Sequence, residues 1–264
     1  MISGVSTAER ENDLEALLSI CNELGGYSRV AAKFDQGELA FEKALKAVDI
    51  LNLRGTEHEA TTMLNYATLF VHSNRPDEAL EKYRIAEVIY AGLDKANDYR
   101  IAALNNNMAS LHIKKHDYEK AEKCADRALE IINETGTDGD EIAVTLSLKA
   151  QIFAGVGEYE KALGELEKAE AVYASVGDPG VMHTAVTDAT FGEVLGKLGR
   201  FDEAFARYEK ALSAVSKNFG ENQNYVSVLR GFAAVKGAAG DSEGKSKLAD
   251  EADRVEAALL GRTL

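Results

Sequence analysis

Residues 97–137 read NDYRIAALNNNMASLHIKKHDYEKAEKCADRALEIINETGT and contain two amphipathic patterns in tandem. The first pattern has apolar residues at i, i+3, i+7 and i+10, on one face of a helix: Ile101, Leu104, Met108 and Leu111. A break follows at His116-Asp117, and a second apolar stripe begins at Tyr118. The stretch closes on residues 133–140, NETGTDGD, whose Gly, Asp and Thr are typical of turns. These residues predict a helix, a short turn, a second helix and a longer loop.

The same unit recurs along the whole chain. Gaps of 42, 42, 41, 42 and 41 residues separate six alanines: Ala44, Ala86, Ala128, Ala169, Ala211 and Ala252. The first helices carry a second column of small residues: Gly25, Ala67, Ala109, Ala150, Gly192 and Ala233. Fixed periods of about 20–50 residues are the signature of solenoids, and small side chains let paired helices approach closely. Residues 1–264 are therefore predicted to form a single all-α solenoid, with repeats at approximately 14–54, 55–96, 97–137, 138–178, 179–220 and 221–260.

A turn column separates the two helices of each unit. Three of its positions hold glycine, which readily adopts the left-handed conformation that ends a helix: Gly157, Gly199 and Gly240. The other three positions hold Ala32, Asn74 and His116. Two residues later, each second helix is expected to begin, at Phe34, Pro76, Tyr118, Tyr159, Phe201 and Ser242.

The two ends of the chain are less regular. Ser6 and Glu9 have the spacing of a capping box that would start the first helix early. The last helix has Leu248, Ala252, Val255 and Leu259 on one face. Leu260 and Leu264 are expected to be exposed or to contact another molecule.

Composition excludes several classes of partner. The formal net charge is −14, so phosphate backbones and anionic lipids are repelled. The first ten residues have no signal-peptide pattern, and no apolar run is long enough to cross a membrane. Cys21 and Cys124 stand at apolar helix positions and are interpreted as buried thiols of a reducing compartment. The prediction is a cytoplasmic protein with no nucleic-acid or membrane partner.

These columns resemble the tetratricopeptide repeat over nearly the whole chain, from about Leu14 to Leu260. The second helices carry the small, bulky and small residues of that family, as in Ala79, Tyr83 and Ala86 or Ala204, Tyr208 and Ala211. The usual period is about 34 residues, whereas this one is 41–42, and the usual closing proline is absent. The longer form is similar to the repeats of kinesin light chains and many bacterial arrays, above all at residues 103–111, ALNNNMASL. The resemblance implies a right-handed superhelix of six helix pairs, about 12 helices, whose first helices line a concave groove.

Polar residues at the groove columns are the candidate binding site for a peptide or a partner segment: Asn22, Arg29, Asn65, Thr68, His72, Asn106, Asn107, Ser110, Lys114, Gln151, Glu193, Lys197 and Arg230. A side-chain amide offers an acceptor and two donors, so it can pair with the backbone of an extended peptide. The cations of this set suit an acidic peptide or a chain-terminal carboxylate. The alternative is that these side chains only solvate an exposed helix face.

No pattern supports catalysis or a cofactor. His112 and His116 are four residues apart, a spacing that can chelate zinc, but no third ligand is near in sequence. The run Asp138-Gly139-Asp140-Glu141 lacks the remaining spacing of a calcium loop. The sequence predicts a non-enzymatic protein–protein interaction module without cofactor or metal. Two alternatives remain: a scaffold that self-associates through exposed terminal repeats, and a regulatory peptide sensor.

Overall fold

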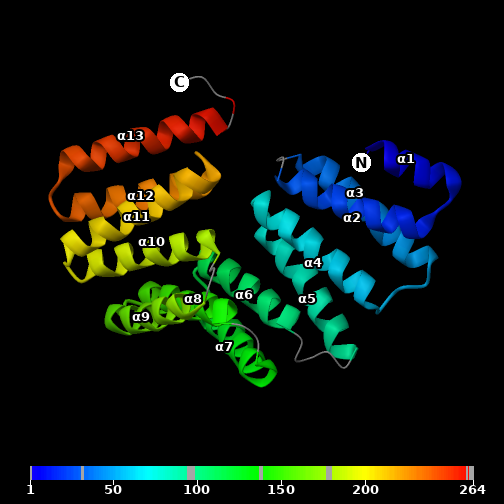
Figure 1. The fold of residues 1–264 in the computed structure, drawn as a ribbon, viewed down its shortest axis with the longest axis horizontal. Coiled ribbons are helices and arrows are strands. Elements are labelled where there is room, and N and C mark those ends of the chain that lie inside the picture. Colours follow the sequence, from blue (N-terminus) through cyan, green and yellow to red (C-terminus); the bar gives the residue numbers. More distant parts are fainter. Residues whose placement is uncertain are drawn as a thin grey trace. The chain divides into compact units, whose positions relative to one another are not determined.

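The computed structural model describes residues 2–30, 33–93, 99–136, 139–176, 180–259 and 261. Over these residues the chain is all helical, with thirteen helices and no strand (Figure 1). In chain order, the helices are α1 (Ile2–Glu11), α2 (Leu14–Val30), α3 (Phe34–Ile50), α4 (Glu57–His72), α5 (Pro76–Gly92), α6 (Tyr99–Lys114), α7 (Tyr118–Thr135), α8 (Gly139–Gly155), α9 (Tyr159–Ser175), α10 (Val181–Lys197), α11 (Phe201–Phe219), α12 (Gln223–Ala238) and α13 (Ser242–Leu259). The predicted all-α solenoid of helix pairs is confirmed, with α1 as an additional helix.

The helices form two compact units. Unit 1 comprises residues 1–115 and 126–136, and unit 2 comprises residues 116–125 and 137–264. In unit 1, α2 packs on α3 and α4 packs on α5, while α2 also contacts α4. In unit 2, the pairs α8–α9, α10–α11 and α12–α13 pack in the same way, and α10 contacts α12. Within each unit, the first helices of neighbouring repeats therefore lie next to one another.

The second helices begin where the sequence predicts. The helices α3, α5, α7, α9, α11 and α13 start at Phe34, Pro76, Tyr118, Tyr159, Phe201 and Ser242. The turn residues before them have positive φ at Asn74, His116, Gly157, Gly199 and Gly240, whereas Ala32 lies outside the described residues. In five of the described turns the same backbone hydrogen bond closes the first helix, for example from the Arg200 N–H to the Leu195 carbonyl at 2.9 Å.

The column of six alanines is the packing column of the second helices. All six side chains have 0% exposure: Ala44, Ala86, Ala128, Ala169, Ala211 and Ala252. The small column of the first helices faces a bulky partner. A Cβ added at Gly25 would lie 2.3 Å from the Phe41 ring, and one added at Gly192 would lie 2.5 Å from the Tyr208 ring. Larger residues at these columns would push the paired helices apart.

The chain before α2 differs from its prediction. Ser6 and Glu9 lie inside α1, so they do not cap the first repeat helix, and the predicted capping box is wrong. Instead, Asn12 adopts φ 54°, and the Asp13 carboxylate accepts a hydrogen bond from the Ala16 N–H at 3.0 Å. Asp13 therefore caps α2. Val5 and Ala8 of α1 are buried in the core of the first repeat.

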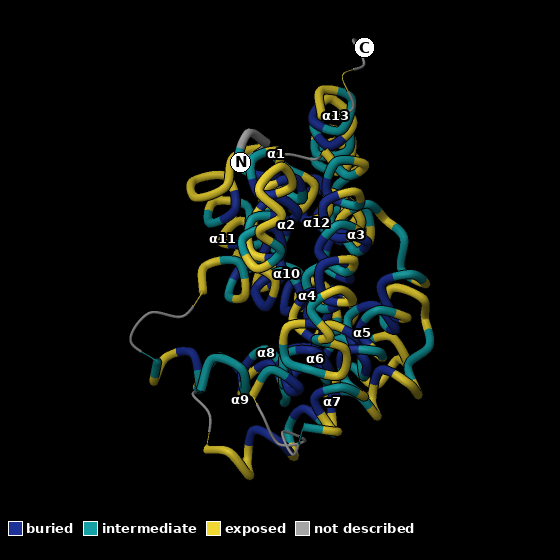
Figure 2. The backbone as a smooth tube through the Cα atoms, turned by 90° about the vertical axis from the view of Figure 1, so that its right-hand side faces the viewer, coloured by how far each residue is buried: buried dark blue, intermediate teal, exposed yellow. Residues whose placement is uncertain are grey.

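Each helix alternates between buried and exposed stretches, as expected for amphipathic helices (Figure 2). The helix α13 buries Ala252 and Val255, whereas Leu259 is half exposed, and Leu260 and Leu264 lie outside the described residues. Neither cysteine forms a disulfide with another described residue; Cys21 is buried, but Cys124 is only partly buried. Among the described helices, none is long and apolar enough to cross a bilayer.

Candidate functional site

The first helices of unit 1 present a polar surface. On α4, Asn65, Thr68 and His72 are spaced i, i+3 and i+7, and on α6 the same spacing holds for Asn107, Ser110 and Lys114. We name these six residues, with Arg29 of α2, the first-helix surface of unit 1. Within it, His72, Asn107 and Lys114 are exposed and the others are half buried. The Thr68 hydroxyl donates to the Leu64 carbonyl and lies 3.3 Å from the Tyr83 hydroxyl.

Two of the predicted site residues have side chains that are used in packing within the fold. The Asn22 amide donates to the Leu18 carbonyl and to the Thr62 hydroxyl, both at 3.1 Å, and so it bridges α2 and α4. Asn106 is buried, with 4% exposure. Neither side chain presents its polar atoms to solvent as the other amides do. Of the amides predicted to bind in unit 1, Asn65 and Asn107 therefore have side chains that are not used in this packing.

Three cationic or titratable groups converge on the first-helix surface of unit 1. The pKa of His72 is lowered, mainly by desolvation and then by the charges of Arg29 and Lys114. Arg29 also acts on Tyr83, whose pKa is raised by burial. The three side chains come from α2, α4 and α6, the first helices of repeats one to three. We call Arg29, His72 and Lys114 the cation cluster.

The predicted residues of unit 2 are divided between two environments. Glu193 and Lys197 are exposed on one face of α10, and Gln151 of α8 is half buried. Arg230 of α12 instead reaches α13, where its guanidinium donates to Glu256 at 2.7 Å and to Asp253 at 3.3 Å. Its charge is thus already paired with two carboxylates of the same repeat.

A pocket of about 200 Å³ opens between α10 and α12. Its wall includes Val186 and Glu193 of α10 and Ser227 and Val228 of α12, above the ring of Tyr208 from α11. Small residues leave the space open, namely Ala185, Ala189 and Gly231. Val186 is 42% exposed, so apolar surface is accessible there. We call this hollow the α10–α12 pocket.

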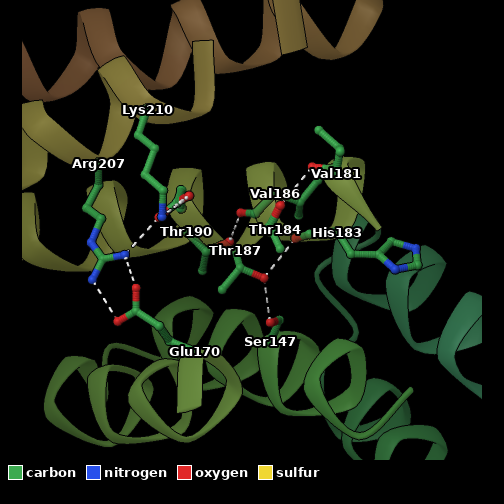
Figure 3. Close-up of polar contacts among 11 residues, drawn as sticks. Ser147, Glu170, Val181, His183, Thr184, Val186, Thr187, Thr190, Arg207 and Lys210 are labelled. Atoms are coloured by element: carbon green, nitrogen blue, oxygen red, sulfur yellow. Dashed lines mark hydrogen bonds and ion pairs between the residues drawn. The ribbon is translucent and has the colours of Figure 1, made fainter. Parts of the chain in front are cut away.

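A buried ion-pair cluster lies elsewhere in unit 2 (Figure 3). Asp188 of α10 is 4% exposed and accepts hydrogen bonds from Arg207 at 2.8 Å and Lys210 at 3.2 Å. The Arg207 guanidinium also holds Glu170 of α9 through two bonds, at 2.6 and 2.9 Å, and covers the Phe191 ring at 4.0 Å. The hydrogen bonds from Arg207 lower the pKa of Glu170. This Asp188 cluster (Glu170, Asp188, Arg207 and Lys210) ties repeat four to repeat five.

Hydroxyl groups continue the polar interior beside this cluster. Thr187 of α10 donates to the His183 carbonyl, and its oxygen lies 2.8 Å from the Ser147 hydroxyl of α8 (Figure 3). Burial raises the pKa of the neighbouring Tyr173 to about 12. A pocket of about 230 Å³ lies over these groups, with Glu170, Tyr173 and Lys210 in its wall. All its charged groups belong to the Asp188 cluster, so the pocket has no spare charge to select an ionic ligand.

The structure offers no metal centre among the residues that it describes. No group of three or more His, Cys, Asp or Glu side chains there could hold an ion. His112 is buried, whereas His116 occupies its turn with φ 56° and lies 3.0 Å from the Tyr118 hydroxyl. Asp138, from the acidic run considered for calcium, lies outside the described residues.

Comparison with known proteins agrees with the repeat geometry. Residues 100–175 match the tetratricopeptide repeat family model. The match covers α6 to α9, so these four helices are identified as tetratricopeptide repeats. Protein KINESIN LIGHT CHAIN-RELATED 2 of Arabidopsis thaliana is 30% identical over 139 residues, which are 50% of this chain and 20% of that protein. The chain thus spans about a fifth of the length of this curated relative.

Solved structures share the tetratricopeptide fold. BtubC (BKLC) of P. vanneervenii has a TM-score of 0.54 and 20% identity, covering 95% of this chain and 94% of that one. NprR, a quorum sensor of B. thuringiensis, was solved in complex with its cognate peptide NprX. That complex has a TM-score of 0.63 and 19% identity, covering 86% of this chain and 64% of the NprR chain. At these identities the likeness concerns the fold alone.

The Asp188 cluster is the feature that the prediction omitted. In the other repeats of this chain, the column of Asp188 holds an apolar residue or an amide: Cys21, Met63, Asn105, Leu146 and Leu229. A carboxylate in a core column is a detectable signal, because a buried charge requires a partner. Asn105 is a second buried polar side chain in this column, and its amide also has a partner, since it donates to the Glu87 carboxylate of α5 at 3.2 Å.

Proposed function

We propose that this protein is a non-enzymatic interaction module that binds a peptide or an extended partner segment on the first helices of its repeats. The α10–α12 pocket is the observation that carries the proposal. It combines accessible apolar surface from Val186 with polar groups at its rim, from Glu193 and Ser227. Sites that bind side chains are mostly apolar with a few polar groups that fix orientation. NprR, which has the same fold and was solved with its cognate peptide, supports this use of the fold.

The first-helix surface of unit 1 supports the same proposal. Asn65 and Asn107 stand at equivalent positions of repeats two and three, and both side chains reach solvent. Each amide can donate to a peptide carbonyl and accept from a peptide N–H, whatever the peptide sequence. Pairing through such amides requires no chemical conversion of the peptide, in keeping with a non-enzymatic interaction module.

The test begins with peptides selected from a random library on the wild-type protein, and then compares variants by fluorescence anisotropy. Ala189→Leu fills the α10–α12 pocket, while Ala206→Leu adds the same volume to the exposed face of α11. We expect Ala189→Leu to weaken binding by about ten-fold, close to the free energy of one buried aliphatic contact, and Ala206→Leu by less than about two-fold. The double variant Asn65→Ala and Asn107→Ala tests unit 1 in the same way.

Two results would contradict the proposal. One is a failure to select any peptide with wild-type protein that is shown to be folded by circular dichroism. The other is a set of peptides whose affinity neither Ala189→Leu nor the Asn65 and Asn107 double variant changes. Light scattering on the same samples separates peptide binding from the scaffold alternative, because self-association makes the apparent mass rise with concentration.

A further inference from the structure

The floor of the α10–α12 pocket is the Tyr208 ring, which reaches from α10 to α12. A Cβ added at Gly192 of α10 would lie 2.5 Å from this ring, and one added at Gly231 of α12 would lie 2.8 Å from its hydroxyl oxygen. The Tyr208 side chain is only 3% exposed, and it stacks on Phe232 with the ring centroids 5.2 Å apart. Its hydroxyl has no hydrogen-bond partner within the described part of unit 2. The floor of the pocket therefore ends in a hydroxyl group that the fold does not use.

The other polar groups of the pocket wall mainly offer acceptors. The Thr190 and Ser227 hydroxyls each donate to a carbonyl of their own helix, at 2.9 and 3.0 Å, so each has used its single proton and keeps only acceptor capacity. The amide nitrogen of Asn224 is directed to the Met182 sulfur at 3.4 Å. Glu193 adds a carboxylate, which only accepts. A ligand that pairs with these groups must therefore donate hydrogen bonds.

The charge at the pocket is negative. Among the described residues that line it, Glu193 is the only charged one, and it forms no ion pair with any of the others that the structure describes. Lys197 follows one turn later on α10 without pairing to it, and the nearby Arg230 is turned toward Glu256 of α13 at 2.7 Å. Burial raises the pKa of the Tyr208 hydroxyl, and the charge of Glu193 raises it further, as expected where the two groups are close. An unpaired carboxylate beside an apolar hollow favours a cation.

We propose that the α10–α12 pocket binds a lysine or arginine side chain of the partner segment. The proposal rests on the proposed function, since it names the side chain that this pocket receives. The methylene stem of the basic residue lies along the apolar surface of Val186 and Ala189, and its head group donates to the Glu193 carboxylate and the Tyr208 hydroxyl. Both basic side chains carry several donors and no acceptor, which matches the acceptors of the wall. An acidic side chain would be repelled by Glu193.

A random peptide library, selected in parallel on three full-length proteins, tests the preference. The proteins are the wild type, Glu193→Gln, which removes the charge but keeps the size of the side chain, and Glu209→Gln, which removes the same charge from the exposed face of α11. We expect lysine or arginine to be enriched at one position of the peptides selected on the wild type and on Glu209→Gln. On Glu193→Gln this enrichment should fall about five-fold, in favour of aliphatic residues.

A thermodynamic cycle then measures the pairing directly. The best wild-type peptide is synthesised with lysine, arginine or norleucine at the enriched position; norleucine keeps the stem of lysine but has no ammonium group. In fluorescence anisotropy, Glu193→Gln should weaken the basic peptides about five-fold and the norleucine peptide by less than about two-fold. Tyr208→Phe keeps the ring and should weaken only the basic peptides, by about three-fold. Glu209→Gln should change every affinity by less than about two-fold, and the order of lysine and arginine identifies the preferred head group.

Two results would overturn the basic side chain as the occupant. One is a set of selected peptides without an enriched basic position. The other is an equal effect of Glu193→Gln and Glu209→Gln on the basic peptides, since general charge would then explain the binding. Either result leaves the proposed function standing if the same peptides remain sensitive to Ala189→Leu. Peptides that bind equally well to Ala189→Leu would instead contradict the use of the α10–α12 pocket itself.

Discussion

Replacement of Asp188 offers a direct test of what holds repeats four and five together. The Asp188 side chain is 6% exposed and pairs with Arg207 and Lys210, whose side chains are 25% and 62% exposed. Removing one partner of a buried ion pair costs about 3–5 kcal/mol, because a charge is left without compensation. Here Arg207 keeps two bonds to Glu170, and Lys210 can return to water. We therefore expect Asp188→Ala to lower the free energy of unfolding by about 2–3 kcal/mol.

The assay is urea unfolding followed by circular dichroism, with matched controls. Glu203→Ala breaks an exposed pair with Arg200 and should leave the stability nearly unchanged. Asp188→Leu combined with Arg207→Met installs apolar residues of similar size and should recover most of the stability lost in Asp188→Ala, because an apolar replacement of a buried pair is often neutral. An Asp188→Ala variant as stable as Glu203→Ala would refute the reasoning.

Three further predictions concern the scaffold. Ala211→Leu should destabilise the protein by about 1–3 kcal/mol or more in urea unfolding, because the alanine is fully buried, whereas Ala206→Leu on the exposed face of the same helix should be nearly neutral. In helix α2, Gly26→Ala should stabilise the protein by about 0.5–1 kcal/mol, because an added Cβ meets nothing within 4 Å. Gly25→Ala should destabilise it, because an added Cβ there would clash with the Phe41 ring. Thermal melts that give the reverse order would contradict the described packing. Burial raises the pKa of Tyr66 and Tyr173 to about 12, so the folded state holds these protons more tightly than the unfolded state. The stability of the protein should therefore be full below about pH 10 and should fall as the pH rises toward 12. Tyr173→Phe should make this loss shallower in alkaline unfolding curves, and an unchanged curve would contradict the assignment.

The repeat scaffold can be predicted from the sequence because the residues that build it recur at equivalent positions of the repeats. Small residues such as Ala44 recur where helices touch, and turn residues such as Gly199 recur where a left-handed conformation is needed. Each column repeats one physical requirement, so six copies reinforce one another. The break before α2 is different: it depends on Asn12 and Asp13 alone, which occur once and therefore leave no periodic signal.

The candidate site was harder to predict because it depends on where individual side chains turn. Helix periodicity assigns a residue to a face but does not say whether its polar atoms are already used. Asn22 is occupied by Thr62, and Arg230 reaches the carboxylates of α13 rather than standing free. Conversely, the α10–α12 pocket arises from three small residues on two helices, a combination that no single column shows.

The most direct test of the central claim is an NMR chemical-shift map of the full chain bound to a library-selected peptide. If partners bind on the first helices, backbone amide shifts should concentrate on α10 and α12, or on α2, α4 and α6. The second helices, including the buried Ala211 and Ala86 that form the scaffold column, should change little. Shifts concentrated on the exposed faces of α3, α5, α9 or α11 would contradict the account.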